Sequence, residues 1–138
     1  MKASIWKASG LVLVCLAVLL VAHVAAAEEK LPPPGALGAK EALSLLHAPG
    51  DRLTIVDVRT PEEYARGHVP GAVLIPLGEL GARLREIPES NPVLLLCRTG
   101  RRAEQAYEIL SRARPGNPRI WFLRGVPEYR QDGSFTFK

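Results

Sequence analysis

The stretch Pro92-Val93-Leu94-Leu95-Leu96-Cys97-Arg98-Thr99-Gly100-Arg101-Arg102 decides how this chain folds. Its first half is a short apolar run, which predicts a strand buried on both faces of a parallel sheet. Its second half leads into a helix that we expect over residues 102–110. The thiol of Cys97 would then lie where free backbone N–H groups meet the positive end of a helix dipole. These surroundings, together with three nearby arginines, favour the nucleophilic thiolate.

Strand and helix patterns alternate on both sides of this stretch. Apolar or β-branched runs predict strands, and apolar residues at helical spacing predict helices. The expected strands are 53–58, 73–75, 92–96 and 120–123, and the expected helices are 40–47, 60–67, 78–87 and 102–110. The run Thr60-Pro61-Glu62-Glu63 has the composition of a capping box with proline at the first helical position. The alternation predicts an α/β fold, with a parallel sheet covered by helices on both faces.

The first 27 residues have the composition of a secretory signal peptide. Lys2 and Lys7 form a basic start, residues 11–24 are almost uninterrupted apolar sequence, and Ala25-Ala26-Ala27 offers a cleavage site. We therefore expect cleavage after Ala27 and a periplasmic or secreted protein. The alternative is an uncleaved anchor that holds the domain on the membrane, facing outside the cytoplasm. Against it, the apolar run is shorter than the roughly 20 residues that a spanning helix needs.

Removal of residues 1–27 leaves 111 of the 138 residues, enough for one small domain. Its formal charge is +2, from 18 Lys and Arg less Lys2 and Lys7, against 14 Asp and Glu. So small a surplus, without a basic helix that carries interleaved aromatics, gives no indication of a nucleic-acid partner. The predicted organisation of the mature chain is a proline-rich lead-in, a single domain and an irregular C-terminal tail: 28–36, 37–131 and 132–138.

The cysteine count argues against a disulfide scaffold. The chain has two cysteines, and Cys15 would leave with the leader. Cys97 then has no intramolecular partner. A single thiol in an oxidising compartment risks unwanted pairing, so its presence suggests a use. The alternative is a buried, inert cysteine, which is a common structural residue.

Three motifs, in this order and at this spacing, resemble those of the rhodanese (thiosulfate sulfurtransferase) family. They are Asp57-Val58-Arg59-Thr60-Pro61-Glu62-Glu63-Tyr64, Gly67-His68-Val69-Pro70-Gly71-Ala72 and Cys97-Arg98-Thr99-Gly100-Arg101-Arg102. The resemblance covers residues 37–131. It implies a three-layer α/β domain whose parallel sheet has about five strands. It also implies a catalytic Cys97 that accepts a sulfane sulfur as a persulfide, without a cofactor.

The same resemblance assigns a substrate- and persulfide-binding loop, a cradle of main-chain N–H groups that stabilises an anion. We expect Arg102 to pack against this loop and Asp57, while Arg98 and Arg101 face the entrance and attract an anionic donor. The loop residues are Arg98, Thr99, Gly100, Arg101 and Arg102, and the supporting residues are Asp57 and Arg59.

The expected reaction moves a sulfane sulfur from a small anionic donor such as thiosulfate to a thiol or cyanide-like acceptor, protein thiols included. A rhodanese-like binding or sulfur-carrier module with little turnover is a second hypothesis, because fold does not fix function. A cysteine-dependent phosphatase or arsenate reductase is a third, but the phosphatase signature is Cys-x5-Arg. Here the spacing from Cys97 to Arg102 is Cys-x4-Arg, a shorter loop that suits a single sulfur atom.

Other residues receive structural assignments. His68 is expected to fix a turn by bonding to the backbone, and His47 to end a helix, and neither has metal-ligand spacing to a second ligand. Trp121 and Phe122 are expected in the core and rim. The rhodanese family often has Leu-x-Gly-Gly followed by tryptophan. This chain has Leu123-Arg124-Gly125-Val126 and then Tyr129, so the rim of its pocket is expected to differ.

Overall fold

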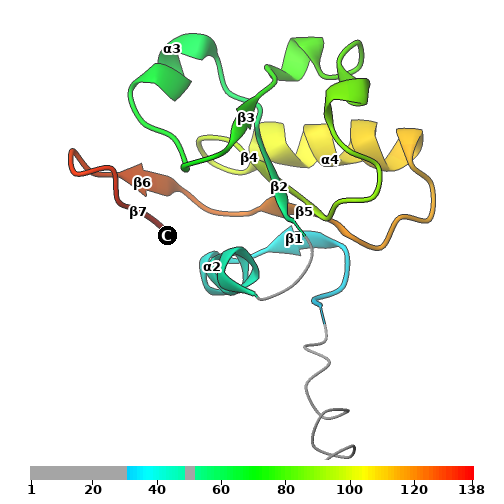
Figure 1. Ribbon diagram of the computed structural model, residues 1–138, viewed down its shortest axis with the longest axis horizontal. Helices are drawn as coiled ribbons and strands as arrows, with labels where there is room; N and C mark the ends of the chain where they lie inside the picture. The colour runs from blue at the N-terminus through cyan, green and yellow to red at the C-terminus, as the bar shows by residue number, and fades with distance from the viewer. Residues whose placement is uncertain (1–30, 49–51) are drawn as a thin grey trace, which may run out of the picture. The chain divides into compact units, whose positions relative to one another are not determined.

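Figure 1 shows the computed structural model, which describes residues 31–48 and 52–138. The predicted signal peptide, residues 1–27, lies outside the described residues. Within the part that the structure describes, no helix has both the length and the apolar character needed to cross a bilayer.

A five-stranded parallel sheet forms the centre of the domain, with strand order β1-β5-β4-β2-β3 (Figure 1). The strands are β1 (Gly35–Leu37), β2 (Thr54–Asp57), β3 (Val73–Leu74), β4 (Val93–Leu96) and β5 (Ile120–Leu123). Every residue of β4 and β5 is buried, as their apolar sequences predict. Asp57 pairs with Leu96 in the register, so β2 and β4 end side by side at one edge of the sheet. The prediction of an α/β domain with about five parallel strands is confirmed.

Helices cover both faces of this sheet. Figure 1 shows α2 (Ala39–His47) on one side and α4 (Arg101–Ala113) on the other. Side chains alternate along β4: Leu95, like Cys97 after it, packs in the cluster under α4, and Leu94 packs in the cluster under α2. The alternation therefore turns Cys97 toward the layer that holds α4.

The helix predicted over residues 78–87 is instead two short 3₁₀ turns, η1 (Leu77–Glu79) and η2 (Leu84–Glu86). Gly78 and Gly81 lower the helix propensity of this segment, because glycine loses more backbone freedom than any other residue on folding. Leu80 and Ile87 of this segment are nevertheless buried in the core.

Both ends of the domain extend farther than the sequence indicated. An antiparallel hairpin of β6 (Pro127–Tyr129) and β7 (Phe135–Phe137) replaces the irregular tail, and Phe137 is buried. At the other end, β1 begins inside the predicted lead-in and pairs with β5. The indole of Trp121 donates to the carbonyls of Pro32 and Pro33 and ties that segment down. Strand pairing thus reaches outside residues 37–131 on both sides.

Candidate active site

Cys97 lies between the end of β4 and the start of α4, as the sequence predicted. Its side chain is 1% exposed, and the Gly100 N–H donates a hydrogen bond to Sγ at 3.1 Å. Gly100 is the N-cap of α4, so this donor belongs to the helix end that carries unused N–H groups and partial positive charge. The loop therefore turns back so that the Gly100 N–H points at the sulfur atom.

Gly100 holds the loop in a conformation that other residues strain to adopt. Its φ angle is +92°, in the left-handed region that favours glycine. A Cβ atom there would lie 3.1 Å from the Leu123 carbonyl oxygen and 3.2 Å from the Arg124 Cα. The positive φ angle and the close contact both require glycine at this position. The Cys97 loop therefore packs closely against the chain that leaves β5.

A cavity of about 340 Å³ opens beside this loop. Two of its arginines, Arg98 and Arg101, are exposed, as expected for residues that face an entrance. Their guanidinium groups can bind the oxygens of an anion in a bidentate manner. The lining residues are Glu63, Arg98, Thr99, Arg101, Arg102 and Gln105.

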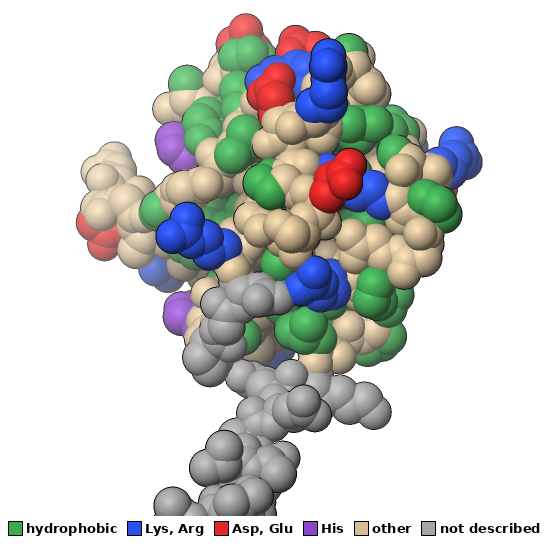
Figure 2. Space-filling model, turned by 45° about the vertical axis from the view of Figure 1, so that its right-hand side comes forward, with side chains coloured by type: hydrophobic (Ala, Val, Ile, Leu, Met, Phe, Trp, Pro, Cys, Tyr) green, Lys and Arg blue, Asp and Glu red, His purple; other side chains and the backbone are tan. Residues whose placement is uncertain are grey.

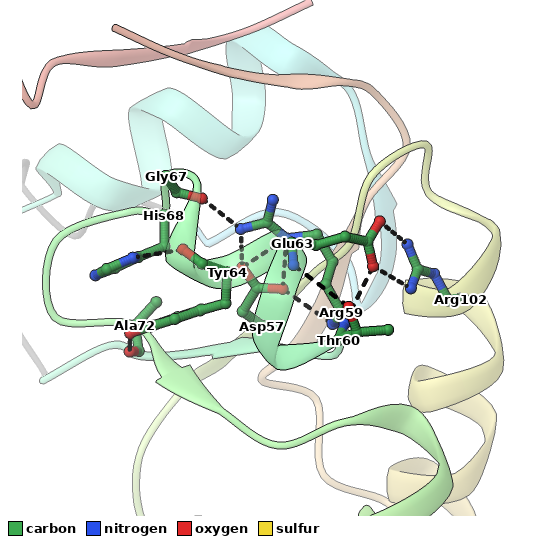
Figure 3. A network of polar contacts seen from close by, with 9 residues as sticks. All are labelled: Asp57, Arg59, Thr60, Glu63, Tyr64, Gly67, His68, Ala72 and Arg102. Carbon is green, nitrogen blue, oxygen red and sulfur yellow. Dashed lines mark hydrogen bonds and ion pairs between the residues drawn. The ribbon is translucent and has the colours of Figure 1, made fainter. Parts of the chain in front are cut away.

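Arg102 bonds to Glu63, so the prediction that it packs against Asp57 is wrong (Figure 3). Its Nη1 and Nη2 donate to the two carboxylate oxygens at 2.7 and 2.8 Å. These bonds lower the pKa of Glu63 to about 2, against the opposing effect of burial. Glu63 also completes the predicted capping box with Thr60 at the start of α3 (Pro61–Ala65). The ion pair thus ties the first turn of α3 to the first turn of α4.

Asp57 and Arg59 form a buried ion pair at the end of β2 (Figure 3). Arg59 Nε lies 2.9 Å from each oxygen of Asp57, and Nη2 donates to Oδ2 at 2.6 Å. Nη2 also donates to the Gly67 carbonyl at 2.7 Å. Burial disfavours the charged guanidinium, but the hydrogen bonds and charge of Asp57 raise the pKa of Arg59 above its ordinary value. The pair joins β2 to the following loop.

Tyr129 on β6 completes this edge and was named by the sequence analysis only as an aromatic after β5. The Arg59 guanidinium carbon lies over the Tyr129 ring, 5.0 Å from its centroid. The Tyr129 hydroxyl is buried and has no hydrogen-bond partner among the described residues. Burial raises the pKa of Tyr129 to about 12; the charge of Arg59 opposes this rise, and the charge of Asp57 adds to it.

His68 holds a turn, as its sequence context suggested. Its ring stacks on Tyr64 with centroids 3.8 Å apart, and Nδ1 lies 3.0 Å from the Tyr64 carbonyl oxygen. The Tyr64 hydroxyl donates to the Ala72 carbonyl and closes the same loop (Figure 3). In residues 31–48 and 52–138, no group of three His, Cys, Asp or Glu side chains is placed to hold a metal ion.

A parallel α/β sheet with a thiol at a strand end, bonded by the N–H of the residue that caps the next helix, is typical of proteins that hold an anion or a sulfur atom on a loop cysteine. Residues 38–129 match the rhodanese-like domain, and the chain belongs to the rhodanese family. A solved structure of the family also has the same fold. A rhodanese-like domain of Anabaena aligns with a TM-score of 0.57 at 26% identity, over 69% of this chain and 70% of that one.

Relatives with assigned names indicate the general chemistry. The chain is 38% identical over 85 residues to a sulfurtransferase of Allochromatium vinosum, which covers 62% of this chain and 78% of the relative. It is 47% identical over 58 residues to the thiosulfate sulfurtransferase PspE of Escherichia coli, covering 41% of this chain and 56% of PspE. It also matches, over 34% of that protein's length, Bacillus subtilis YrkF, whose name proposes a sulfur carrier. These relatives support sulfur transfer as the general function.

Proposed function

We propose that this chain is an exported sulfurtransferase that moves a sulfane sulfur from a small anionic donor to a thiol or cyanide-like acceptor through a persulfide on Cys97. The observation that carries the proposal is the hydrogen bond from the Gly100 N–H to Cys97 Sγ, at 3.1 Å, in the loop between β4 and α4. A carboxyl edge of a parallel sheet is also the usual place for a ligand site in an open α/β fold.

In the first half-reaction the Cys97 thiolate attacks the outer sulfur of thiosulfate. A new S–S bond forms between Cys97 and that sulfur, while the S–S bond within thiosulfate breaks. The bonding electron pair leaves with sulfite, and the outer sulfur remains on the protein as an anionic persulfide. No external oxidant or reductant is needed, because the sulfane sulfur carries its oxidation state with it.

In the second half-reaction the acceptor attacks the outer sulfur of the persulfide. Cyanide would leave as thiocyanate, and a thiolate would leave as a persulfide of its own. The electron pair of the broken S–S bond returns to Cys97 as thiolate, which restores the starting form. The two half-reactions predict a ping-pong course with a covalent intermediate.

The two exposed arginines of the cavity supply the charge that this donor needs. Arg98 and Arg101 flank the loop, whereas the guanidinium of Arg102 is already paired with Glu63. Because Cys97 is 1% exposed, a donor must present a narrow end to it, and the outer sulfur of thiosulfate is such an end. On the described part of the face in Figure 2, basic and acidic side chains are interspersed, so selection of an anion would depend on local arginines.

Export is a part of the proposal that residues 1–27 support by composition. Expression of the full chain with fractionation and N-terminal sequencing tests it. A mature protein that begins at Glu28, outside the cytoplasm, is expected. An intact leader in the membrane fraction would favour the anchored alternative, and full-length protein in the cytoplasm would contradict both.

The activity is tested by steady-state assay with thiosulfate and cyanide, measuring sulfite and thiocyanate. We expect both products in equal amounts, parallel double-reciprocal lines and no turnover in Cys97→Ser. Stoichiometric loading of Cys97 with very slow release to every thiol tested would favour a carrier, the role that the name of YrkF proposes for that relative. Absence of loading from thiosulfate and from organic persulfides alike would reject sulfur transfer.

A further inference from the structure

The cavity beside the Cys97 loop has one carboxylate among three arginines. Glu63 lines it together with Arg98, Arg101 and Arg102. A negative group on the wall of a site opposes the binding of anions there, because like charges repel each other. The carboxylate of Glu63 therefore bears on which anions this cavity accepts.

Contacts with two chain segments fix the Glu63 carboxylate (Figure 3). The Thr60 N–H donates to Oε2 at 3.1 Å, as part of the capping box of α3. Arg102 Nη1 donates to Oε2 at 2.7 Å, and Nη2 donates to Oε1 at 2.8 Å. Because the hydrogen bonds from Arg102 lower the pKa of Glu63 to about 2, the carboxylate stays ionised throughout the neutral range. Its charge and its orientation are thus present before any ligand binds.

Glu63 occupies the edge of the Arg102 guanidinium that suits an anion best. A guanidinium binds a carboxylate or another oxyanion in a bidentate manner, through a pair of parallel N–H groups. In Arg102 the N–H groups of Nη1 and Nη2 are directed at Glu63. By contrast, Arg98 and Arg101 are exposed, and neither forms an ion pair with another residue that the structure describes. The cavity therefore offers a donor two free guanidinium groups, although three arginines line it.

We propose that Glu63 is a positioning residue that withholds Arg102 from the sulfur donor and thereby limits the preference of the site for dianions over monoanions. This inference rests on the proposed function, since it concerns the selection of the donor. A third free guanidinium would stabilise a dianion more than a monoanion, because Coulomb attraction increases with the charge of the ligand. With Arg102 withheld, monoanionic sulfane donors such as organic thiosulfonates are accepted beside thiosulfate.

Two donors of similar shape distinguish this role from a general attraction of anions. Thiosulfate carries two negative charges, whereas methanethiosulfonate carries one, because a methyl group replaces one oxygen. In each donor Cys97 would attack the outer sulfur, and the electron pair of the broken S–S bond would leave with sulfite or with methanesulfinate. In a ping-pong reaction kcat/KM for the donor reports this half-reaction alone, so the ratio of the two values measures the charge preference of the site.

The test compares full-length wild type with Glu63→Gln and, as a matched control, Glu108→Gln. Glutamine keeps an oxygen that can accept from the Thr60 N–H, but it removes the charge that holds Arg102. Glu108 on α4 also pairs with an arginine, Arg112, but both side chains are exposed and Glu108 is not among the residues that line the cavity. We expect the ratio of kcat/KM for thiosulfate to kcat/KM for methanethiosulfonate to rise about threefold or more in Glu63→Gln and to stay unchanged in Glu108→Gln.

A second readout does not depend on turnover. Sulfate is a dianion without a sulfane sulfur, and calorimetric titration measures its dissociation constant. This constant is expected to fall about threefold or more in Glu63→Gln. In an Arg102→Gln background the same substitution should change the constant and the donor ratio clearly less, because no guanidinium is left to release. A loss of stability alone would move neither quantity.

The outcomes separate this inference from the proposed function. An unchanged donor ratio or an unchanged sulfate constant in Glu63→Gln would overturn the inference and leave the proposed function standing. An equal rise in Glu108→Gln would assign the effect to net charge, and an equal effect without Arg102 would assign it to the carboxylate alone, so either result would overturn the inference too. If wild type loads from no sulfane donor, the proposed function fails, and the sulfate constants alone then decide whether Glu63 withholds Arg102 from anions.

Discussion

The adjacent strands β2 and β4 end at the same edge of the sheet, yet their ends are built differently. After β2, the carboxylate of Asp57 accepts hydrogen bonds from the Arg59 backbone and guanidinium, and both side chains are buried. After β4, the Cys97 sulfur accepts one recorded hydrogen bond, from the Gly100 N–H. At the β2 end, both carboxylate oxygens of Asp57 accept hydrogen bonds from Arg59. At the β4 end, a backbone N–H is the recorded donor to the sulfur of Cys97.

The difference suggests that the β2 end has a structural role and that the β4 end carries the reaction. A buried ion pair fixes the loop that carries Gly67 and His68, and it keeps no acceptor free for a ligand. A thiol held by a single N–H retains capacity for new bonds, which a persulfide intermediate requires. We therefore expect substitutions at the β4 end to affect sulfur transfer and substitutions at the β2 end to affect stability.

The largest expected effect is on activity, in Cys97→Ser. A serine oxygen cannot carry the sulfane sulfur, so turnover with thiosulfate and cyanide should fall to background. The fold should remain, with a change in unfolding free energy of about 1 kcal/mol or less, because the side chains are nearly equal in size. The assay and a urea titration measure the two quantities. Residual turnover above a tenth of the wild-type rate would break the assignment of the nucleophile.

The next effect is on stability, in Asp57→Asn. Asparagine keeps the shape but leaves the buried Arg59 charge without its partner, which should lower the unfolding free energy by about 3–5 kcal/mol. The control is Glu108→Gln, which removes an exposed pair with Arg112 and should cost about 0.5 kcal/mol or less. Urea unfolding measures both. Equal losses in the two variants would contradict the contrast between the β2 end and an ordinary surface pair.

Gly100→Ala and Gly116→Ala sharpen the contrast at the β4 end. Both glycines have positive φ, +92° and +77°, so each substitution should cost about 1–2 kcal/mol of backbone strain. Only at Gly100 would the new Cβ press on other chain atoms, because nothing lies within 4 Å of the Gly116 position. We therefore expect a further loss of sulfur transfer, tenfold or more, in Gly100→Ala alone. A normal rate in Gly100→Ala would show that the loop geometry is not required.

The smallest expected effect comes from Glu63→Gln and depends on pH. The pKa of Glu63 is lowered from 4.5 to about 2, so its pairing with Arg102 stabilises the fold above pH 4.5 and is lost as pH falls toward 2. The side chains are 23% and 31% exposed, so the loss at pH 7 should be about 1 kcal/mol or less. Unfolding free energies measured from pH 5 to pH 2 should fall less steeply in the variant. Parallel curves would indicate that the pair contributes nothing.

The sequence was most informative where local pattern and buried position coincide. The apolar run before Cys97 and the strand Ile120–Leu123 were predicted within a residue, because a central parallel strand is apolar on both faces. The position of Cys97 between a strand and a helix was predicted because an apolar run ends there and a helical pattern begins.

The features that the sequence did not predict depend on contacts between segments that are far apart in the chain. Glu63 and Arg102 are 39 residues apart, and the capping box alone had accounted for Glu63. The β6–β7 hairpin was missed since its strands have three residues each and one begins with proline. The alternation Phe135-Thr136-Phe137 was the signal available for it. The position of Tyr129 beside Arg59 follows from this hairpin and could not be predicted without it.

The central claim is that the sulfur held at the end of β4 carries the transferred atom. It is tested most directly by intact mass spectrometry of reduced protein after exposure to thiosulfate and before any acceptor is added. Wild type should gain the mass of one sulfur atom, located by peptide mapping on the peptide that contains Cys97, and cyanide should remove it. An unchanged mass in wild type, or an equal gain in Cys97→Ser, would contradict the account.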